Sequence, residues 1–355
     1  DMNFSRDAIS GQEGFESLKQ ILKIDPQAIV IFMTAYADTD KAVRAIKAGA
    51  TDFIPKPWEK EKLLATLTSG MRLRHSQREV NILKEQVELL SGQNSSEGDI
   101  IGESPAMQEV FTTINKLSST DANILILGEN GTGKDVIARL LYRCSPRYGK
   151  PFVTIDLGSI PEQLFESELF GFEKGAFTDA KKSKAGRMEV ATNGTLFLDE
   201  IGNLSLPMQS KLLTAIEKRQ INRLGSTQAV PIDVRLICAT NADIRQLVDE
   251  GNFRQDLLYR INTIEIHIPP LRERGNDIIL LAEYFLQRYA RKYKKDMRGL
   301  TREAKNKLLK YAWPGNVREL QHTIERAVIL GDGSLLKPEN FLFHASPKQR
   351  EEEEM

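Results

Sequence analysis

Apolar residues follow two different spacings along the first seventy residues. Phe15, Leu18, Ile21 and Leu22 recur at helical intervals, which predicts a helix over residues 14–24. Residues 28–33 form a continuous apolar run, as a strand buried on both faces requires. Further helices are predicted over residues 39–49 and from residue 59 to about residue 73, with a short strand over 52–54. This order predicts the rear part of a small doubly wound α/β domain over residues 1–70.

The next segment carries a heptad pattern. Leu73, Val80 and Val87 lie seven residues apart, and Leu83 and Leu90 fill intervening apolar positions. This seam predicts a coiled-coil linker over residues 71–98 that dimerises the chain. Because the seam is short and its first intervening position is polar, a linker helix packed on its own domain remains the alternative. The polar, glycine-punctuated residues 91–98 mark a domain boundary.

Beyond residue 99 the pattern alternates again and then becomes helical. Apolar runs predict strands over residues 123–127, 152–155, 195–198 and 234–239. From residue 269 onward, helical spacing predicts helices over residues 276–293, 301–311 and 317–330. We therefore expect a nucleotide-binding α/β core over residues 99–268 and a helical lid over residues 269–345. The charged residues 346–355 favour a disordered tail.

Composition agrees with a folded chain of several domains. Its 355 residues suit two or three domains, and 41% hydrophobic and 28% charged residues are typical of globular proteins. The 49 basic and 49 acidic residues balance, which argues against a chain that is mainly nucleic-acid-binding. No apolar run is long enough to span a bilayer and no signal peptide is visible, so we expect a cytoplasmic protein without membrane contact. The two cysteines and four histidines lack metal-ligand spacing.

A glycine-rich segment follows the predicted strand over residues 123–127 and opens a helix. This is the context that the GxxxxGK phosphate loop requires. Glycines let successive backbone N–H groups turn toward phosphate oxygens, and Lys134 places a positive charge against the β- and γ-phosphates. We therefore predict that ATP is bound by the whole segment, namely Gly128, Glu129, Asn130, Gly131, Thr132, Gly133, Lys134 and Asp135.

Two adjacent carboxylates end the predicted strand over residues 195–198. Ligands of parallel sheets bind at the carboxyl ends of strands, so Asp199 and Glu200 are expected beside the phosphate loop. Asp199 is predicted to hold Mg²⁺, and Asp135 stands where phosphate loops usually carry the Ser or Thr that ligates this metal. Glu200 is placed to polarise the attacking water. Since hydrolysis needs such a base and binding does not, the pair indicates an ATPase.

With these motifs the sequence resembles the NtrC-like family of sigma-54-dependent transcriptional activators, which are AAA+ ATPases. The resemblance covers about residues 101–342, and residues 168–180 are similar to the family signature around GAFTGA. In the family this loop contacts the sigma factor. The resemblance thus implies a loop that binds sigma-54, made of Gly175, Ala176, Phe177, Thr178, Asp179 and Ala180.

The resemblance also implies roles that spacing alone does not give. Asn241 matches the first sensor, which reads the γ-phosphate, and Arg318 matches the second sensor on the lid. Arg254 and Arg260 match the arginine fingers that reach the ATP of a neighbouring subunit. Activity would then require a ring of six or seven subunits. The implied catalytic set is Glu200, Asp199, Arg254, Arg260 and Lys134.

Three positions depart from common patterns. Asp135 replaces the hydroxyl residue of the general phosphate loop, although members of this family commonly carry an acidic residue there. Asp156 stands where the family usually has an asparagine that restrains the catalytic glutamate, and a carboxylate there would repel Glu200. Asp179 replaces the second glycine of GAFTGA, which removes backbone freedom and adds a charge at the loop tip.

The first seventy residues resemble the back half of a response-regulator receiver domain. Asp1 matches the phosphoacceptor, Thr34 and Phe53 match the switch residues, and Lys56 matches the lysine that contacts the phosphate. A histidine kinase would be the phosphate donor. The paired acidic residues that bind Mg²⁺ in this family precede the segment, so this chain by itself is not expected to be phosphorylated. A degenerate domain that never takes phosphate is the alternative.

Together these features predict an ATP-hydrolysing activator that remodels the closed promoter complex of sigma-54 RNA polymerase, with ATP and Mg²⁺ as cofactors. A dimer is expected when inactive and a ring when active. The start at Asp1 suggests a fragment, and enhancer DNA would be contacted by a C-terminal helix-turn-helix not present in this chain. The alternatives are an AAA+ remodeller of another partner, such as an unfoldase, and an ATP-binding regulator of a different sigma class.

Overall fold

The computed structural model describes residues 12–25, 28–34, 44–71, 100–178 and 180–343. The chain divides into two units, Asp1–Gln86 and Val87–Met355, which are described separately. The predicted coiled coil beyond residue 71, residues 39–43 of the predicted helix over residues 39–49, and the charged tail lie outside the described residues.

The N-terminal unit contains a pair of parallel strands covered by helices. Helix α1 spans Gln12–Ile24, strand β1 spans Ile31–Thr34 and strand β2 spans Asp52–Pro55; residues 44–47 and 60–71 are also helical. The register places Thr34 beside Pro55 at the carboxyl ends of both strands. Leu18, Phe32 and Ala45 are buried together. The predicted α/β class of this unit is confirmed.

The larger unit is built on a five-stranded parallel sheet with the order β11-β3-β10-β7-β4. Its strands are β3 (Ile124–Leu127), β4 (Phe152–Asp156), β7 (Thr195–Asp199), β10 (Arg235–Thr240) and β11 (Ile264–His267). The first four are the strands predicted from apolar runs. Strand β11 was not predicted, because it alternates Ile-Glu-Ile-His instead of forming an apolar run.

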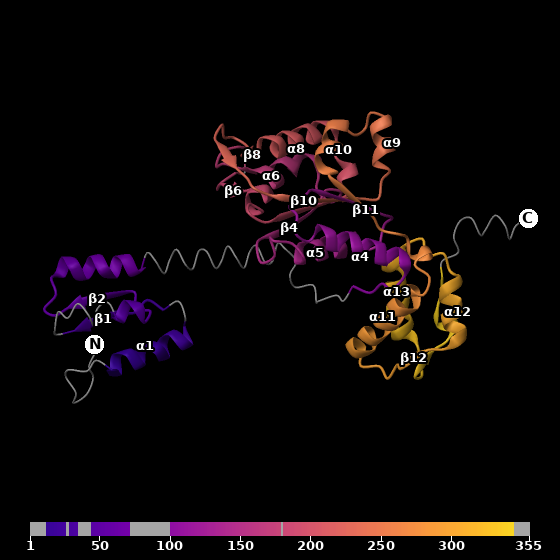
Figure 1. The fold of residues 1–355 in the computed structure, drawn as a ribbon, viewed down its shortest axis with the longest axis horizontal. Helices are drawn as coiled ribbons and strands as arrows, with labels where there is room; N and C mark the ends of the chain where they lie inside the picture. Colours follow the sequence, from indigo (N-terminus) through magenta and orange to yellow (C-terminus); the bar gives the residue numbers. More distant parts are fainter. Residues whose placement is uncertain (1–11, 26–27, 35–43, 72–99, 179, 344–355) are drawn as a thin grey trace, which may run out of the picture. The chain divides into compact units, whose positions relative to one another are not determined.

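Helices cover both faces of this sheet. On one side lie α4 (Pro105–Leu117) and α5 (Lys134–Arg143), and on the other lie α6 (Glu162–Phe170), α8 (Leu206–Lys218) and α10 (Gln255–Ile261) (Figure 1). Two apolar clusters follow this division, one around Phe152, Phe197 and Ile237 and the other around Leu196 and Leu236. Side chains that alternate along each strand fill the two clusters, as a sheet buried on both faces requires.

Several short elements connect the layers. They are β5 (Gly171–Phe172) paired with β6 (Lys184–Ala185), β8 (Gln220–Asn222) paired with β9 (Ala229–Pro231), α7 (Arg187–Val190), η1 (Ile201–Asn203) and α9 (Ile244–Asp249). The first hairpin requires glycine: Gly171 has φ +81°, and a Cβ there would lie 2.5 Å from the backbone N of Gly186.

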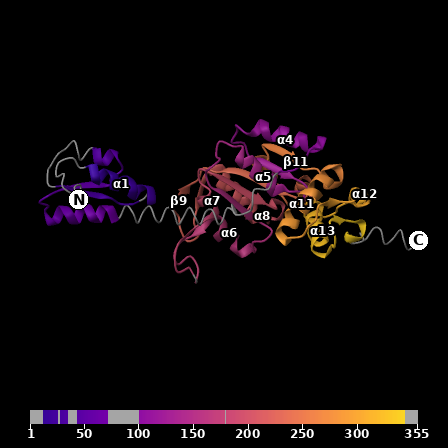
Figure 2. The ribbon, with the colours of Figure 1, turned by 90° about the horizontal axis from the view of Figure 1, so that it is seen from below.

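The lid has its own core beside the sheet (Figure 1, Figure 2). It contains η2 (Leu271–Glu273), α11 (Asp277–Tyr293), β12 (Gly299–Leu300), α12 (Arg302–Lys310), α13 (Asn316–Leu330), β13 (Leu335–Leu336) and η3 (Pro338–Asn340). The three predicted helices are confirmed to within a residue or so at each end. Trp313, fully buried, is central to this core.

None of the helices in the described ranges combines the length and the apolar character that a bilayer crossing demands.

Candidate active site

The carboxyl edge of the sheet brings together three of the predicted catalytic residues, Lys134, Asp199 and Glu200. Strand β3 leads into the phosphate loop, β7 ends at Asp199, and β10 leads into Asn241. The backbone N–H of Gly128 donates to Thr240 O at 3.3 Å, which joins the start of the loop to β10. Because neighbouring parallel strands end at the same edge, three distant segments of the sequence meet here.

Lys134 lies at the centre of the phosphate loop. Its ammonium group donates to Gly128 O at 3.1 Å and lies 3.4 Å from Glu200 Oε1. The side chain is only 6% exposed, and Lys134 is the first residue of α5. Gly131 and Gly133 have φ of +78° and +99°, values that favour glycine. The loop therefore surrounds a buried positive charge at a helix N-terminus, the arrangement that binds phosphate.

Asp199 is the last residue of β7, and Glu200 follows it in a left-handed backbone conformation. Glu200 has φ +55° and its N–H donates to Asp199 Oδ1 at 3.0 Å, while Glu200 Oε2 accepts from the N–H of Asn241 at 3.5 Å. Burial, and then the charge of Glu200, raise the pKa of Asp199. Glu200 thus lies between Lys134 and Asn241, while Asp199 accepts from the Glu200 N–H and also feels the charge of Lys134, which partly offsets the rise in its pKa.

Asp156 ends β4 directly beside Asp199 in the sheet register. Its Oδ1 accepts from the N–H of Gly158 at 3.0 Å, and its charge adds to the causes that raise the pKa of Asp199. The sequence predicted that the Asp156 carboxylate would repel Glu200, whereas in the structure its charge acts on the neighbouring Asp199.

Asp135, the other predicted metal ligand, lies exposed in the first turn of α5. In the described part of the chain, no three His, Cys, Asp or Glu side chains converge closely enough to hold a metal alone. Mg²⁺ at this edge would therefore depend on phosphate oxygens in addition to a carboxylate, as is usual for this ion.

An apolar cavity of about 190 Å³ opens beside the phosphate loop, between the core and the lid. It is lined by residues from four segments, among them Ile101, Val136, Tyr284 and Val317, and by the loop residues Thr132 and Gly133. No sequence pattern indicated this cavity, because these apolar residues look like ordinary core positions of separate helices.

Arg318, the predicted second sensor, is exposed on α13. It lines a cavity of about 360 Å³ that also contains Asn130 of the phosphate loop and, further along the same helix, His322 and Arg326. The lid thus places this arginine next to the loop, as the resemblance implied, without a direct contact to Lys134.

The two predicted arginine fingers lie elsewhere. Arg254 is exposed and pairs with Asp256, with Nη2 at 2.6 Å from Oδ2. Arg260 lines a cavity of about 470 Å³ at the amino edge of the sheet, together with Asp121, Arg147 and Asp233. Among the described residues, neither arginine contacts the phosphate loop, Asp199 or Glu200 of its own chain.

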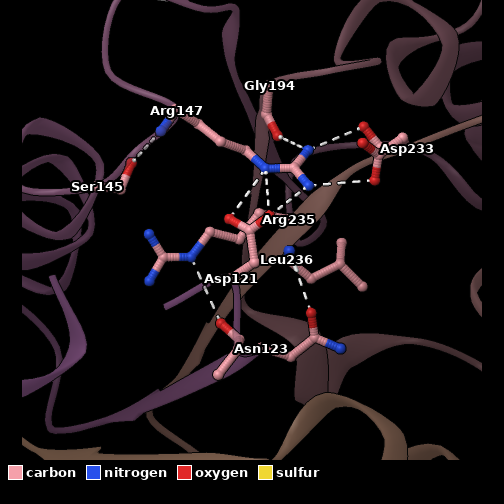
Figure 3. A network of polar contacts seen from close by, with 9 residues as sticks. Asp121, Asn123, Ser145, Arg147, Gly194, Asp233, Arg235 and Leu236 are labelled. Atoms are coloured by element: carbon pink, nitrogen blue, oxygen red, sulfur yellow. Dashed lines mark hydrogen bonds and ion pairs between the residues drawn. The ribbon is translucent and has the colours of Figure 1, made fainter. Parts of the chain in front are cut away.

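The amino edge of the sheet is held by Arg147 (Figure 3). Its guanidinium donates to both carboxylate oxygens of Asp121, to Asp233 Oδ1 at 3.1 Å and to the carbonyl of Gly194 at 3.1 Å. This network fixes the segments that precede β3, β7 and β10, and it holds the pKa of Asp121 below its usual value, chiefly through the Arg147 hydrogen bond.

The predicted partner loop projects from the β5–β6 hairpin. Gly175 N–H donates to Ala180 O at 2.9 Å, and Ala180 N–H donates to Phe177 O at 3.0 Å. The Phe177 ring is 43% exposed and lies 4.9 Å from that of Phe172. Thr178 is exposed, Ala176 packs against Gly225, and Asp179 lies outside the described residues.

Arg223, which the sequence did not single out, braces the base of this loop. Its guanidinium lies 2.7 Å from Glu173 Oε1 and 2.5 Å from Glu189 Oε1. These two carboxylates raise the pKa of Arg223, Glu189 more strongly. The bridge joins β8, the start of the loop and α7.

In the N-terminal unit, Thr34 ends β1 and Lys56 follows β2, so the two residues share the carboxyl edge of that sheet. Phe53 is partly buried against the core of this unit. The Lys56 ammonium lies 5.9 Å from the centre of the Trp58 ring. Asp1, the predicted phosphoacceptor, lies outside the described residues.

Comparisons with known proteins agree with this architecture. The profile described as Sigma-54 interaction domain matches residues 100–267, the AAA+ ATPase lid domain matches residues 272–355, and the response regulator receiver domain matches residues 6–68. The transcriptional regulatory protein ZraR of Klebsiella oxytoca is 45% identical over 324 residues, which are 91% of this chain and 71% of ZraR. This chain belongs to the ZraR- and NtrC-like family of sigma-54-dependent response regulators.

Other relatives support the same assignment. The DNA-binding transcriptional regulator NtrC of Escherichia coli (strain K12) is 44% identical over 324 residues, covering 91% of this chain and 67% of NtrC. A crystal structure of NtrX from Brucella abortus in complex with ADP has a TM-score of 0.65 at 31% identity, covering 95% of this chain and 75% of NtrX. A second NtrX structure, in complex with ATP, has the same TM-score.

The predicted family, fold class and general function are thus confirmed. The chain is an AAA+ ATPase activator that interacts with sigma-54 and is regulated by a receiver domain.

Proposed function

We propose that this chain hydrolyses ATP at the interfaces of a hexameric or heptameric ring and thereby remodels the closed complex of sigma-54 RNA polymerase. The observation that carries the proposal is the separation of the two halves of the site. Lys134 and Glu200 lie at the carboxyl edge of the sheet, whereas Arg260 lies at the amino edge. This separation supports a shared site, in which the arginines that act on ATP come from the neighbouring protomer.

Within this site the residues take distinct roles. Backbone amides of residues 128–135 and Lys134 hold the β- and γ-phosphates, and Glu200 orients the attacking water. Asn241 reads the γ-phosphate from the core and Arg318 contacts the nucleotide from the lid, while Arg254 and Arg260 act on the ATP of the next protomer. The apolar cavity beside Thr132 suits a purine base, and the complexes of NtrX with ADP and ATP support this ligand class.

Mg²⁺ is proposed as the metal. Asp199, assisted by Asp135, would hold it against the triphosphate, and the donor set fits because carboxylate oxygens are hard ligands. Bound there, Mg²⁺ supplies positive charge to the transferring phosphoryl group. The burial that raises the pKa of Asp199 also leaves this carboxylate poorly hydrated.

The loop of residues 175–180 is proposed as the contact to sigma-54. The exposed Phe177 ring offers an apolar anchor at its tip, and the bridge from Arg223 to Glu173 and Glu189 gives the loop a firm base. The carboxylate of Asp179 adds a charge that the family motif lacks.

Regulation is proposed to pass through residues 1–70 and 71–98. In a receiver that includes the paired acidic residues for Mg²⁺, a cognate histidine kinase would phosphorylate Asp1, and Thr34, Phe53 and Lys56 would respond, releasing a dimer held by the linker. The core would cover residues 99–268, the lid 269–345 and the tail 346–355. Enhancer DNA would be contacted by a C-terminal helix-turn-helix, and the protein would work in the cytoplasm, with RNA polymerase.

The test is transcription by purified sigma-54 RNA polymerase from a supercoiled template, with this chain and ATP. We expect open complexes with the wild-type chain and none with Glu200→Ala, together with loss of ATP hydrolysis. Turnover that did not depend on Glu200 would refute the mechanism. Hydrolysis without open complexes, but with unfolding of a model substrate, would instead favour an AAA+ remodeller of another partner.

A further inference from the structure

The outer side of the phosphate loop is held by the lid. The carbonyl of Asn130 accepts from Asn316 Nδ2 at 3.0 Å, and the carbonyl of Gly131 accepts from the N–H groups of Val317 and Arg318 at 2.9 and 3.3 Å. One residue on, the carbonyl of Thr132 accepts from Arg274 Nη2 at 2.9 Å. Three successive carbonyls are thus bound by donors from outside the loop.

These carbonyl contacts determine where the opposite N–H groups point. In a planar trans peptide, the C=O of one residue and the N–H of the next point in opposite directions. Holding Asn130 O and Thr132 O toward the lid therefore turns the N–H groups of Gly131 and Gly133 toward the phosphate side. Within the described ranges, neither N–H donates to a protein atom, so both are available to a phosphate.

Asn316 is the residue best suited to this contact. It is fully buried with φ +52°, a region that asparagine tolerates better than most residues. Its Oδ1 accepts from the N–H of Leu271, at the hinge between core and lid, at 2.8 Å. Its Nδ2 donates to Asn130 O and to Glu129 Oε2, the latter at 3.1 Å. One amide therefore joins the hinge, the lid helix and the loop.

Glu129 and Arg272 complete the contact. Arg272 binds both carboxylate oxygens of Glu129, at 2.6 and 2.9 Å. Arg272, and then Asn316, hold the pKa of Glu129 below its ordinary value. The Glu129 carboxylate is therefore ionised at neutral pH and accepts a hydrogen bond from Asn316. A carboxylate at position 316 would be a second acceptor and would repel Glu129.

We propose that Asn316 is a positioning residue for ATP turnover: it aligns the phosphate-binding N–H groups with the lid, so that lid orientation and phosphate binding are coupled. The proposal rests on the ATP site assigned above. It adds a second connection between lid and nucleotide, acting through the loop backbone, to the direct one through Arg318.

The test compares the full chain carrying Asn316→Asp with Asn193→Asp. Asn193 also has a positive φ, of +62°, but is exposed and remote from the phosphate loop. Asn316→Asp keeps the shape and the acceptor for Leu271 while losing the donor. We expect the KM for ATP to rise at least about tenfold, because the side chain no longer donates to Asn130 O or to the charged Glu129, with kcat changed less than threefold. Asn193→Asp should match wild type in both.

Hydrogen exchange of the nucleotide-free protein gives a readout that does not depend on ATP. Asn316→Asp should speed exchange in residues 128–134 and 313–320 together and leave the rest of the core unchanged. Asn316→Gly, which tolerates the positive φ and adds no charge, should do the same. Glu129→Gln combined with Asn316→Asp should recover part of the lost affinity.

Wild-type KM together with unchanged exchange in Asn316→Asp and Asn316→Gly would overturn the proposal. If the wild-type chain itself failed to bind ATP, the assigned site would be wrong, whereas the exchange result would still decide whether Asn316 holds the loop to the lid.

Discussion

The ammonium nitrogen of Lys134 lies 3.4 Å from Glu200 Oε1, so the lysine expected to bind phosphate is paired with the expected general base. ATP would compete for Lys134 and release Glu200 toward the attacking water. Nucleotide binding and activation of the base are thus linked through one ion pair, and removing the charge of Glu200 should affect the two steps in opposite ways.

We expect Glu200→Gln to lower kcat at least about 100-fold while the Kd for ATP stays equal or becomes smaller. The amide cannot take a proton, but it no longer holds Lys134 by charge. Fluorescent-nucleotide titration and phosphate release measure the two quantities. Glu217→Gln, an exposed carboxylate on α8, is the matched control. A weaker affinity in Glu200→Gln would contradict the competition.

Arg260 lies at the edge of the sheet opposite its own phosphate loop, so hydrolysis should depend on assembly. Arg260→Ala should lower kcat by about 10³-fold, the effect typical of an arginine finger. Mixing Arg260→Ala with Glu200→Gln should restore activity, because some interfaces then combine an intact base with an intact arginine. Arg245→Ala, which removes an exposed arginine, is the control. Mixtures as inactive as their components would exclude a shared site.

The centre of this site could be predicted from the sequence because parallel sheets follow simple rules. Apolar runs marked β3, β7 and β10, and polar residues at their carboxyl ends had to meet at one edge. Those rules and the phosphate-loop motif place Lys134, Asp199 and Glu200 at the same edge of the sheet, where they lie. The family resemblance added Asn241, whose N–H lies 3.5 Å from Glu200 Oε2.

What the sequence did not predict depends on contacts between distant segments. The apolar cavity combines Ile101, Val136 and Tyr284, which have no common pattern along the chain. The amide of Asn316 binds Asn130, 186 residues earlier. Strand β11 was missed because Glu265 and His267 interrupt its isoleucines, so the sequence shows no apolar run there. The side-chain partners of Arg223 lie 34 and 50 residues away, at separations that no periodicity indicates.

Arg223 bridges Glu173 and Glu189 at the base of the partner loop. Replacing Arg223 should therefore impair open-complex formation while leaving ATP hydrolysis nearly unchanged. Arg223→Lys keeps the charge but cannot bind two carboxylates with a planar fork. We expect both Arg223→Lys and Arg223→Ala to hydrolyse ATP within about threefold of wild type and to form at least about tenfold fewer open complexes, because each variant loses at least one charge-assisted contact. Lys218→Ala, an exposed basic residue on α8, is the control. Normal open-complex formation by Arg223→Ala would show that the loop needs no such base.

Tyr311 donates its hydroxyl to Glu319 Oε1 at 3.0 Å, and Glu319 Oε2 accepts from the N–H of Gly315, just before Asn316. Burial, followed by this hydrogen bond, raises the pKa of Tyr311 from 10.0 to about 12. Because the folded-state pKa is raised, the stability that the protonated phenol contributes is fully present below pH 10 and is lost as the pH rises through 12. We therefore expect Tyr311→Phe to lower the free energy of unfolding by about 1 kcal/mol below pH 10, and the difference from the parent to disappear toward pH 12. The difference in unfolding free energy is measured by urea unfolding followed by Trp313 fluorescence, in a Trp58→Phe background. Trp313 reports on the lid because its ring lies 5.0 Å from that of Tyr311.

Tyr259→Phe, at a tyrosine that is 73% exposed, is the control and should show no pH-dependent difference in stability. A difference that stayed constant from pH 8 to pH 12 would mean that the hydroxyl of Tyr311 does not titrate with folding.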